Sequence, residues 1–240
     1  MTEGRVQLPA ARPGAGGFLT LTASASPRPA IVLLPAIAGV NDYIFRVSRR
    51  LAAAGYVTLA LDYYDGGGPP PLDSPQQIMA AVAALDDARV VNDAIAAIRH
   101  LADESFVRDE QVAVMGFCIG GSLALLGASA DDQAFRGAVV YYGVLRYGST
   151  TDTKPISPLD AVDNLRCPLV AHFGENDHLV AFDDVLELRK RTAGRPAEIF
   201  TYPGAGHAFH EDFRPEVYRP VASTVSWTRT MAFLDWYLSQ

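Results

Sequence analysis

Short apolar runs alternate with amphipathic stretches along most of this chain. Apolar residues recur every three or four positions at Ile44, Val47 and Leu51, which is the spacing of one helix face. Six other runs are rich in aliphatic and β-branched residues and have the length of buried strands. They are Ala30–Leu34, Tyr56–Leu61, Gln111–Met115, Gly137–Tyr142, Pro168–Phe173 and Ala197–Tyr202.

Strands that alternate with helices predict a mainly parallel sheet with helices on both faces, an α/β fold. The 240 residues suffice for one well-buried core and their composition marks no second one, so we predict a single domain over residues 1–240. Residues 1–17 are rich in Gly, Pro and Ala and are predicted to form a loosely ordered lead-in. GFLTLTAS at 17–24 predicts an edge strand, and GGGPPP at 66–71 predicts a loop.

Charge and cysteine content exclude several classes of protein. The net charge is −7 and the basic residues are scattered, which argues against a nucleic acid or an anionic membrane surface as partner. The start of the chain lacks an apolar signal core and no apolar run could span a bilayer, so we expect a cytoplasmic protein, a monomer or small homo-oligomer. Cys118 and Cys167 form no CxxC or Cys/His cluster, so neither a disulfide framework nor a metal site is predicted.

The sequence GFCIGG at 116–121 lies between a strand-like run and the helix-like SLALLGASA. Cys118 is therefore predicted at an abrupt strand-to-helix turn of the form Gly-x-nucleophile-x-Gly. The first N–H groups of a helix and the positive end of its dipole stabilise a thiolate and a developing oxyanion. The alternative is a small buried cysteine in a glycine-rich turn, and for Cys167 such a structural role is favoured.

A base and an orienting acid follow later in the chain. Asp177 comes just after the run Pro168–Phe173, and His207 comes just after the next run. Because the carboxyl ends of parallel strands meet at one edge of a sheet, both side chains are expected beside Cys118. The three residues are thus predicted to form a triad of nucleophile, acid and histidine base.

Other groups could compete for these roles. Glu175 could replace Asp177 as the orienting acid, and His210 could line the pocket or belong to a surface loop. Ser122 should face the helix packing and is not expected to act as nucleophile. The remaining histidines have structural interpretations: His172 in a strand, His178 in a loop and His100 at the end of a helix.

Together with LLPAIAGVN at 33–41 and LALDYYDG at 59–66, these motifs resemble the dienelactone hydrolase family of α/β-hydrolases over roughly residues 28–238. The resemblance implies an α/β-hydrolase fold with Cys118 as nucleophile, His207 as base and Asp177 as its partner. It also implies an oxyanion hole made by the backbone N–H groups of Ile37 and Ile119. Family members hydrolyse lactones or activated esters without metal or organic cofactor.

Two positions depart from the family pattern. Ala36 stands where the family has a glutamate that contacts the resting cysteine, and Glu211 stands where it has an arginine that holds the substrate carboxylate. A carboxylate at position 211 would repel an anionic substrate. Arg214 could hold an anion, although a solvated loop arginine is the simpler interpretation. We therefore expect Cys118 to attack a neutral ester or lactone, which is hydrolysed through a thioester.

Without the family glutamate, Cys118 is expected to pair with the imidazole of His207 and to be alkylated quickly by iodoacetamide near neutral pH. Two other functions stay open, a binding protein on a hydrolase scaffold and a thiol-dependent isomerase or cyclase. Several residues that lie in or beside the motif loops are candidate substrate-binding residues. They are Ala36, Tyr43, Tyr64, Phe209 and His210.

Overall fold

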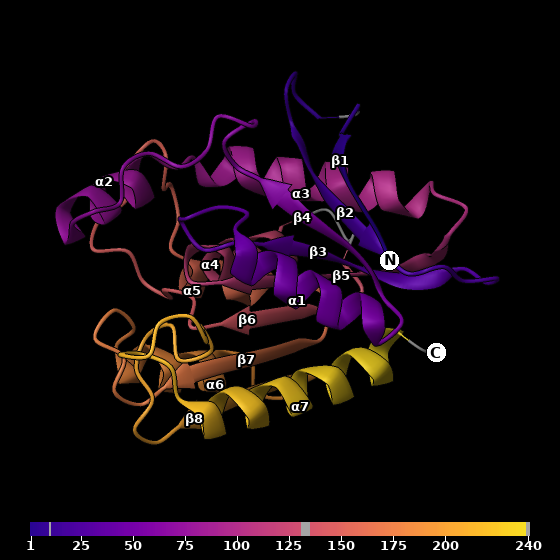
Figure 1. Cartoon of the computed structure of the whole chain (residues 1–240). Coiled ribbons are helices and arrows are strands. Elements are labelled where there is room, and N and C mark those ends of the chain that lie inside the picture. Colours follow the sequence, from indigo (N-terminus) through magenta and orange to yellow (C-terminus); the bar gives the residue numbers. More distant parts are fainter. Residues whose placement is uncertain (10, 131–134, 239–240) are drawn as a thin grey trace.

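Eight strands form one sheet in the part of the chain that the structure describes, residues 1–9, 11–130 and 135–238 of a computed structural model (Figure 1). The strand order is β1-β2-β4-β3-β5-β6-β7-β8. β1 is antiparallel to β2 and β2 to β4, and all later neighbours are parallel. The strands are β1 (Thr2–Gln7), β2 (Gly16–Leu21), β3 (Arg28–Leu34), β4 (Val57–Asp62), β5 (Val107–Phe117), β6 (Ala138–Tyr141), β7 (Leu169–Gly174) and β8 (Ala197–Tyr202).

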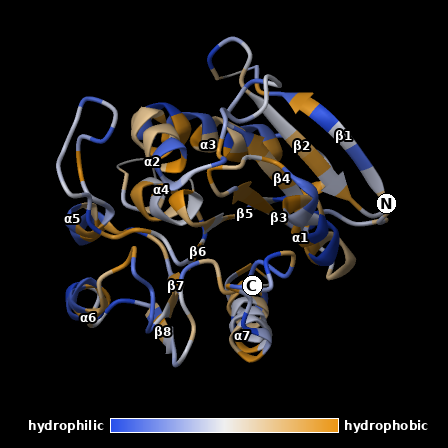
Figure 2. Ribbon diagram, turned by 60° about the vertical axis from the view of Figure 1, so that its left-hand side comes forward, coloured by the Kyte–Doolittle hydropathy of each residue, from blue (hydrophilic) through white to orange (hydrophobic). Residues whose placement is uncertain are grey.

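Helices cover both faces of the sheet, as the alternating pattern predicts. α1 and α7 pack on one face, and α3, α4 and α6 pack on the other (Figure 1). In Figure 2 the central strands β3 and β5 carry mostly hydrophobic residues, whereas the edge strand β1 is largely hydrophilic. The helices are α1 (Asp42–Ala53), α2 (Pro75–Ala84), α3 (Asp87–Ala102), α4 (Ile119–Ala128), α5 (Pro158–Ala161), the 3₁₀ turn η1 (Val162–Asn164), α6 (Phe182–Arg191) and α7 (Pro220–Leu238).

The six predicted strands are all present, and five of them agree within two residues at both ends; β5 begins four residues before the predicted start at Gln111. They read as continuous apolar runs because a parallel sheet is covered on both faces; every residue of β4 and of β7 is buried. Their parallel direction brings the ends of β5, β7 and β8 to the same edge of the sheet. The functional residues predicted after these strands must therefore meet there.

The lead-in predicted for residues 1–17 is wrong, and so is the edge position of the strand that follows it. Residues 2–7 form β1, which pairs with β2 and places β2 between two neighbours; residue 10 lies outside the described part. The glycines that suggested a loop allow close strand pairing. A Cβ at Gly16 would lie 2.5 Å from the carbonyl oxygen of Val6, and one at Gly17 would lie 2.5 Å from that of Ala60.

The loop predicted at 66–71 is confirmed, since it falls between β4 and α2. None of the described helices has both the length and the apolar character needed to cross a bilayer. His172 is completely buried in β7, where its ring nitrogens lie 2.9 Å from the hydroxyl of Tyr202 and 3.0 Å from that of Thr230. Its predicted packing role is confirmed.

Candidate active site

Cys118 occupies the joint between β5 and α4. Its backbone has φ +55° and ψ −123°, a conformation that residues other than glycine rarely adopt and that is often found at functional sites. Close packing leaves no room for side chains on either side of it. A Cβ at Gly116 would lie 1.9 Å from the carbonyl oxygen of Gly120, and one at Gly120 would lie 2.0 Å from that of Leu34. The predicted strand-to-helix turn is therefore present, and its glycines are sterically required.

Ser122 and Cys167, which the sequence analysis did not favour as nucleophiles, occupy structural positions. Ser122 is completely buried and donates its hydroxyl hydrogen to the carbonyl oxygen of Val144 at 2.8 Å. Cys167 is buried before β7, and burial raises the pKa of its thiol to about 12. Cys118 itself is partly exposed, as a nucleophile that meets a substrate must be.

The acid and the histidine meet at the same edge of the sheet. Asp177 follows β7 and accepts a hydrogen bond from Nδ1 of His207, at 2.9 Å from its Oδ2. The other carboxylate oxygen of Asp177 accepts the backbone N–H groups of Leu179 at 2.8 Å and Val180 at 3.2 Å. Asp177 is thus fixed in a side-chain position with no solvent exposure, whereas Glu175 is exposed. The structure favours Asp177 as the orienting acid.

Cys118 lies close enough to His207 to affect its charge. Burial alone would lower the pKa of His207, but the charge of Cys118 and the hydrogen bond with Asp177 outweigh it and raise this pKa to about 10. Because Asp177 holds Nδ1, the nitrogen left for proton exchange is Nε2, which is buried and has no hydrogen-bond partner of its own among the described residues. This arrangement favours a protonated imidazole beside Cys118 at neutral pH.

The backbone N–H groups of Ile37 and Ile119 are the donors predicted for the oxyanion hole. Ile119 is the first residue of α4, and Ile37 lies in the loop between β3 and α1. Neither N–H group donates to a backbone or side-chain acceptor in the described ranges. Both can therefore donate to an oxyanion that forms on a substrate bound next to Cys118.

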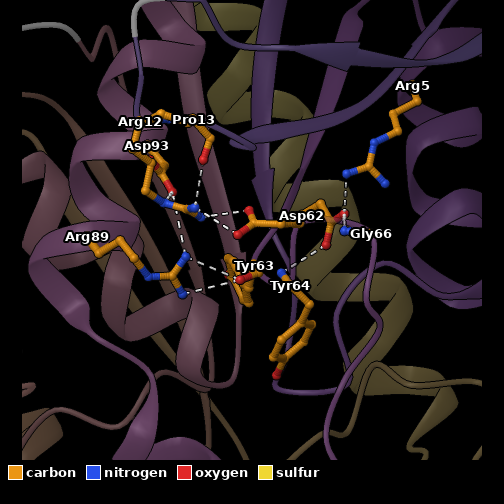
Figure 3. Close-up of polar contacts among 10 residues, drawn as sticks. Arg5, Arg12, Pro13, Asp62, Tyr63, Tyr64, Gly66, Arg89 and Asp93 are labelled. Carbon is orange, nitrogen blue, oxygen red and sulfur yellow. Dashed lines mark hydrogen bonds and ion pairs between the residues drawn. The ribbon is translucent and has the colours of Figure 1, made fainter.

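Two tyrosines hold the loop that carries Ile37, a role that the sequence analysis missed. Tyr63 donates its hydroxyl hydrogen to the carbonyl oxygen of Pro35 at 2.9 Å, and Tyr64 donates to that of Ile37 at 2.5 Å. Arg89 of α3 in turn donates two hydrogen bonds of 3.2 Å to the carbonyl oxygen of Tyr63 (Figure 3). Tyr64, proposed from the sequence as a pocket wall, thus positions the loop whose Ile37 N–H group is the predicted oxyanion donor.

Replacing Tyr64 by phenylalanine should lower kcat by about 10-fold and leave KM nearly unchanged. Complete loss of an oxyanion donor costs roughly 10²–10³-fold in kcat, and here the donor stays but loses its restraint. Tyr56→Phe is the matched control, because its hydroxyl bonds Asp235 at 2.6 Å, away from the loop. Steady-state kinetics on a p-nitrophenyl ester measure both variants. An equal loss in the two, or an effect on KM alone, would argue against the positioning role.

Two other candidate pocket residues are buried against each other. The hydroxyl of Tyr43 lies 2.6 Å from Nδ1 of His210, and these residues are 6% and 2% exposed. The surface-loop interpretation of His210 is therefore wrong; the sequence after His207 turns back into the core. Phe209 is fully buried and packs against Tyr142 and Tyr202, so it belongs to the core and does not face substrate. Ala36 is half-buried in the loop that carries Ile37.

Buried histidines should make the protein sensitive to acid. Burial is the main cause that lowers the pKa of His210 to about 3 and that of His172 well below its usual range. Both are neutral in the folded state and gain a proton on unfolding below about pH 6.5. Their contribution to stability is therefore complete above this pH and is lost as the pH falls towards 3, at about 1.4 kcal/mol per pH unit for each histidine.

Urea unfolding between pH 7 and pH 4 tests this expectation. In His210→Phe, the unfolding free energy should fall less steeply with decreasing pH, by about 1.4 kcal/mol per pH unit, which is the contribution of one buried histidine. His178→Gln, at an exposed loop position, should leave the slope unchanged. Identical slopes for His210→Phe and the parent protein would show that His210 titrates normally.

Glu211 and Arg214 neutralise each other beside the site. Glu211 is 6% exposed, and burial raises the pKa of its carboxyl although Arg214 and His207 oppose this. Arg214 lies 3.1 Å from Glu211 and 3.0 Å from Glu216. Its charge is thus balanced by two carboxylates, so Arg214 is not a free clamp for an anion. Its side chain is 43% exposed in the segment between β8 and α7, which agrees with the solvated loop arginine expected from the sequence.

A mainly parallel sheet with a strained cysteine after β5, a carboxylate after β7 and a histidine after β8 is the arrangement of an α/β-hydrolase. The dienelactone hydrolase family matches residues 16–238, and the chain belongs to this family. The protein is a hydrolase of that family. No group of three or more His, Cys, Asp or Glu in the described residues is arranged to hold a metal ion.

Three relatives place the chain within the family. It is 41% identical over 212 residues to a probable 2-oxo-3-(5-oxofuran-2-ylidene)propanoate lactonase of Bradyrhizobium sp, over 88% of this chain and 84% of the relative. It is 31% identical to a putative carboxymethylenebutenolidase of Escherichia coli K12, over 89% of this chain and 78% of that protein. The crystal structure of a putative dienelactone hydrolase from Klebsiella pneumoniae superposes with a TM-score of 0.89 at 27% identity, over 100% of this chain and 98% of that one.

Proposed function

We propose that the protein hydrolyses lactones or activated esters through a thioester on Cys118. The observation that carries this proposal is the position of Cys118. Cys118 is partly exposed at the strained turn before α4, and it lies close enough to His207 to raise the pKa of that histidine. Nδ1 of His207 is hydrogen-bonded to the buried carboxylate of Asp177. Similarity to a protein named as a lactonase supports the class of substrate.

The residues carry out two successive displacements. The Cys118 thiolate adds to the carbonyl carbon, and the electron pair of the C=O bond moves to the oxygen, which the Ile37 and Ile119 N–H groups stabilise. The C–O bond to the leaving alkoxide then breaks as His207 transfers its proton to that oxygen. His207 next takes a proton from water, whose oxygen attacks the thioester. The C–S bond breaks, which returns the thiolate and yields a carboxylic acid.

Nucleophile chemistry limits the substrates. A thiolate leaves a tetrahedral adduct more readily than an amine does, so an amide adduct tends to revert. An alkoxide or phenoxide from an ester or lactone is a good enough leaving group for the reaction to go forward. Esters and lactones are therefore preferred to amides.

An uncharged substrate fits the charges around the site. The buried carboxyl of Glu211 lies near His207, and the nearby Arg214 is already paired with two carboxylates. A carboxylate on the substrate would therefore lack a free cation at this position. The Bradyrhizobium relative is named for a lactone that itself carries a carboxylate. Lactones with a free carboxylate and uncharged lactones therefore need a direct comparison.

Kinetics on a pair of lactones with the same ring make this comparison, one with a free carboxylate and one with its methyl ester. We expect kcat/KM to be about 10-fold or more higher for the methyl ester, since a desolvated unpaired charge costs more than 1.4 kcal/mol. The reverse ratio would contradict substrate neutrality. The product mass separates hydrolysis, which adds one water, from isomerisation, which adds none, and a binding protein would give no product.

A further inference from the structure

A small recess opens on the face of the sheet covered by α1 and α7, separate from the turn at Cys118. It lies between α1, the segment after His207 and the start of α7. Its cavity volume of about 50 Å³ exceeds the ~15 Å³ that one water molecule requires, so it has room for a ligand of a few heavy atoms. We call it the α1–α7 recess. Its lining residues are Tyr43, Arg46, Val47, Arg50, His210, Asp212, Tyr218 and Ser223.

His210 places an unpartnered polar atom at this recess. It is 2% exposed, and its Nε2 is buried without a hydrogen bond to any described residue. Its Nδ1 lies 2.6 Å from the hydroxyl of Tyr43. A phenol is a better donor than a neutral imidazole, so Tyr43 donates to Nδ1 and the ring hydrogen of His210 is on Nε2. Nε2–H is thus a buried donor that lacks an acceptor, which is unfavourable unless a ligand or water supplies one.

The recess also has one positive charge that no carboxylate balances. Arg46 is paired with Asp212 at 2.5 Å. Arg50 stacks on the ring of Trp227, with its guanidinium carbon 3.8 Å from the ring centre, and it forms no ion pair or hydrogen bond within the described ranges. Ser223, 7% exposed, adds a hydroxyl that donates to no described residue.

We propose that the α1–α7 recess binds a small monocarboxylate anion. A carboxylate accepts hydrogen bonds only, and the recess offers the donors of Arg50, His210 and Ser223 around one unbalanced positive charge. Compounds of this class are also what ester and lactone hydrolysis releases. None of Cys118, Asp177 and His207 lines the recess. The site is therefore distinct from the catalytic one.

The fluorescence of Trp227 provides a direct readout. The chain has two tryptophans, and Trp236 is 65% exposed on α7, so Trp236→Phe leaves Trp227 as the sole reporter. In this background, acetate should give a saturable change with a Kd on the order of millimolar. Ionic strength is held with sodium MOPS, whose anion is too large for the recess. Acetamide, a neutral molecule of the same shape, should give no saturable change.

Two arginines of α1 provide a matched pair of variants. Their affinity for acetate is measured by calorimetry, because Arg50 contacts Trp227 and its replacement would change the fluorescence directly. Arg50→Gln should weaken acetate binding by about 10-fold or more, as expected for the loss of a charge-assisted contact. Arg49→Gln removes the same charge from the same helix, but Arg49 is paired with Glu3 at 2.7 Å and does not line the recess. Its acetate affinity should change less than about 2-fold, because exposed charges are screened by salt. Ser223→Ala is a milder second test and should weaken binding by about 3-fold or more.

Alkylation of Cys118 by iodoacetamide separates this site from the catalytic one. Acetate binding should survive alkylation whether or not Cys118 is the nucleophile. Loss of binding on alkylation would place acetate in the active site and overturn the proposal. So would the absence of saturation, an equal response to acetamide, or unchanged affinity in both Arg50→Gln and Ser223→Ala. Inorganic phosphate should bind more weakly than acetate, and tighter binding would rule out a carboxylate site.

Discussion

Replacing Cys118 by alanine is expected to lower kcat by about 10³-fold or more, because loss of a triad nucleophile leaves only the oxyanion hole and substrate binding. The backbone at this position has φ +55°, which is about equally unfavourable for alanine and for cysteine. The unfolding free energy of the variant should therefore stay close to that of the parent. Hydrolysis of p-nitrophenyl acetate under saturating conditions measures the effect.

Cys167→Ala is the control for this experiment. It removes the only other thiol of the chain, which lies before β7, and it should retain hydrolysis within a few-fold of the parent. If Cys118→Ala kept a tenth or more of the parent rate, or if Cys167→Ala lost as much, the thiol of Cys118 would not be the nucleophile.

Gly120→Ala should destabilise the protein by about 3 kcal/mol or more, or prevent its folding. The added Cβ would lie 2.0 Å from the carbonyl oxygen of Leu34 and 2.5 Å from that of Pro35. Both neighbours are backbone atoms, so α4 and the loop after β3 would have to separate, and overpacking of this kind is among the costly mechanisms. Unfolding in urea measures the change.

Gly148→Ala provides the matched control, since a Cβ there would meet nothing within 4 Å. It should change the unfolding free energy by less than about 0.5 kcal/mol. Equal midpoints for Gly120→Ala and the parent would contradict the close packing at the turn. Any folded Gly120→Ala protein should also lose kcat, because the displaced segments carry the amides of Ile37 and Ile119.

The sequence was sufficient to predict the parallel sheet and the order of the three catalytic candidates. Apolar runs such as Gln111–Met115 identify strands covered on both faces, and parallel strands oblige Cys118, Asp177 and His207 to meet at one edge. The pairing of Asp177 with His207 adds a detail that spacing alone left open against Glu175.

What the sequence analysis missed depends on contacts between distant segments. Tyr64 donates to a carbonyl 27 residues away, and no local pattern marks such a bond. β1 is short and polar, and it is a strand because Gly16 of β2 allows the backbone of Val6 to approach closely. His210 looks like a loop residue, yet its partner Tyr43 is 167 residues away. Each depends on tertiary packing that overrides the local composition.

Peptide mapping after acid quench of a reaction with p-nitrophenyl acetate tests the central claim most directly. The account predicts one acetyl group on Cys118, removed by neutral hydroxylamine as a thioester is, with longer accumulation in His207→Gln because water attack then lacks its base. An acetyl group on a serine, or turnover without any adduct on Cys118 in either protein, would contradict it.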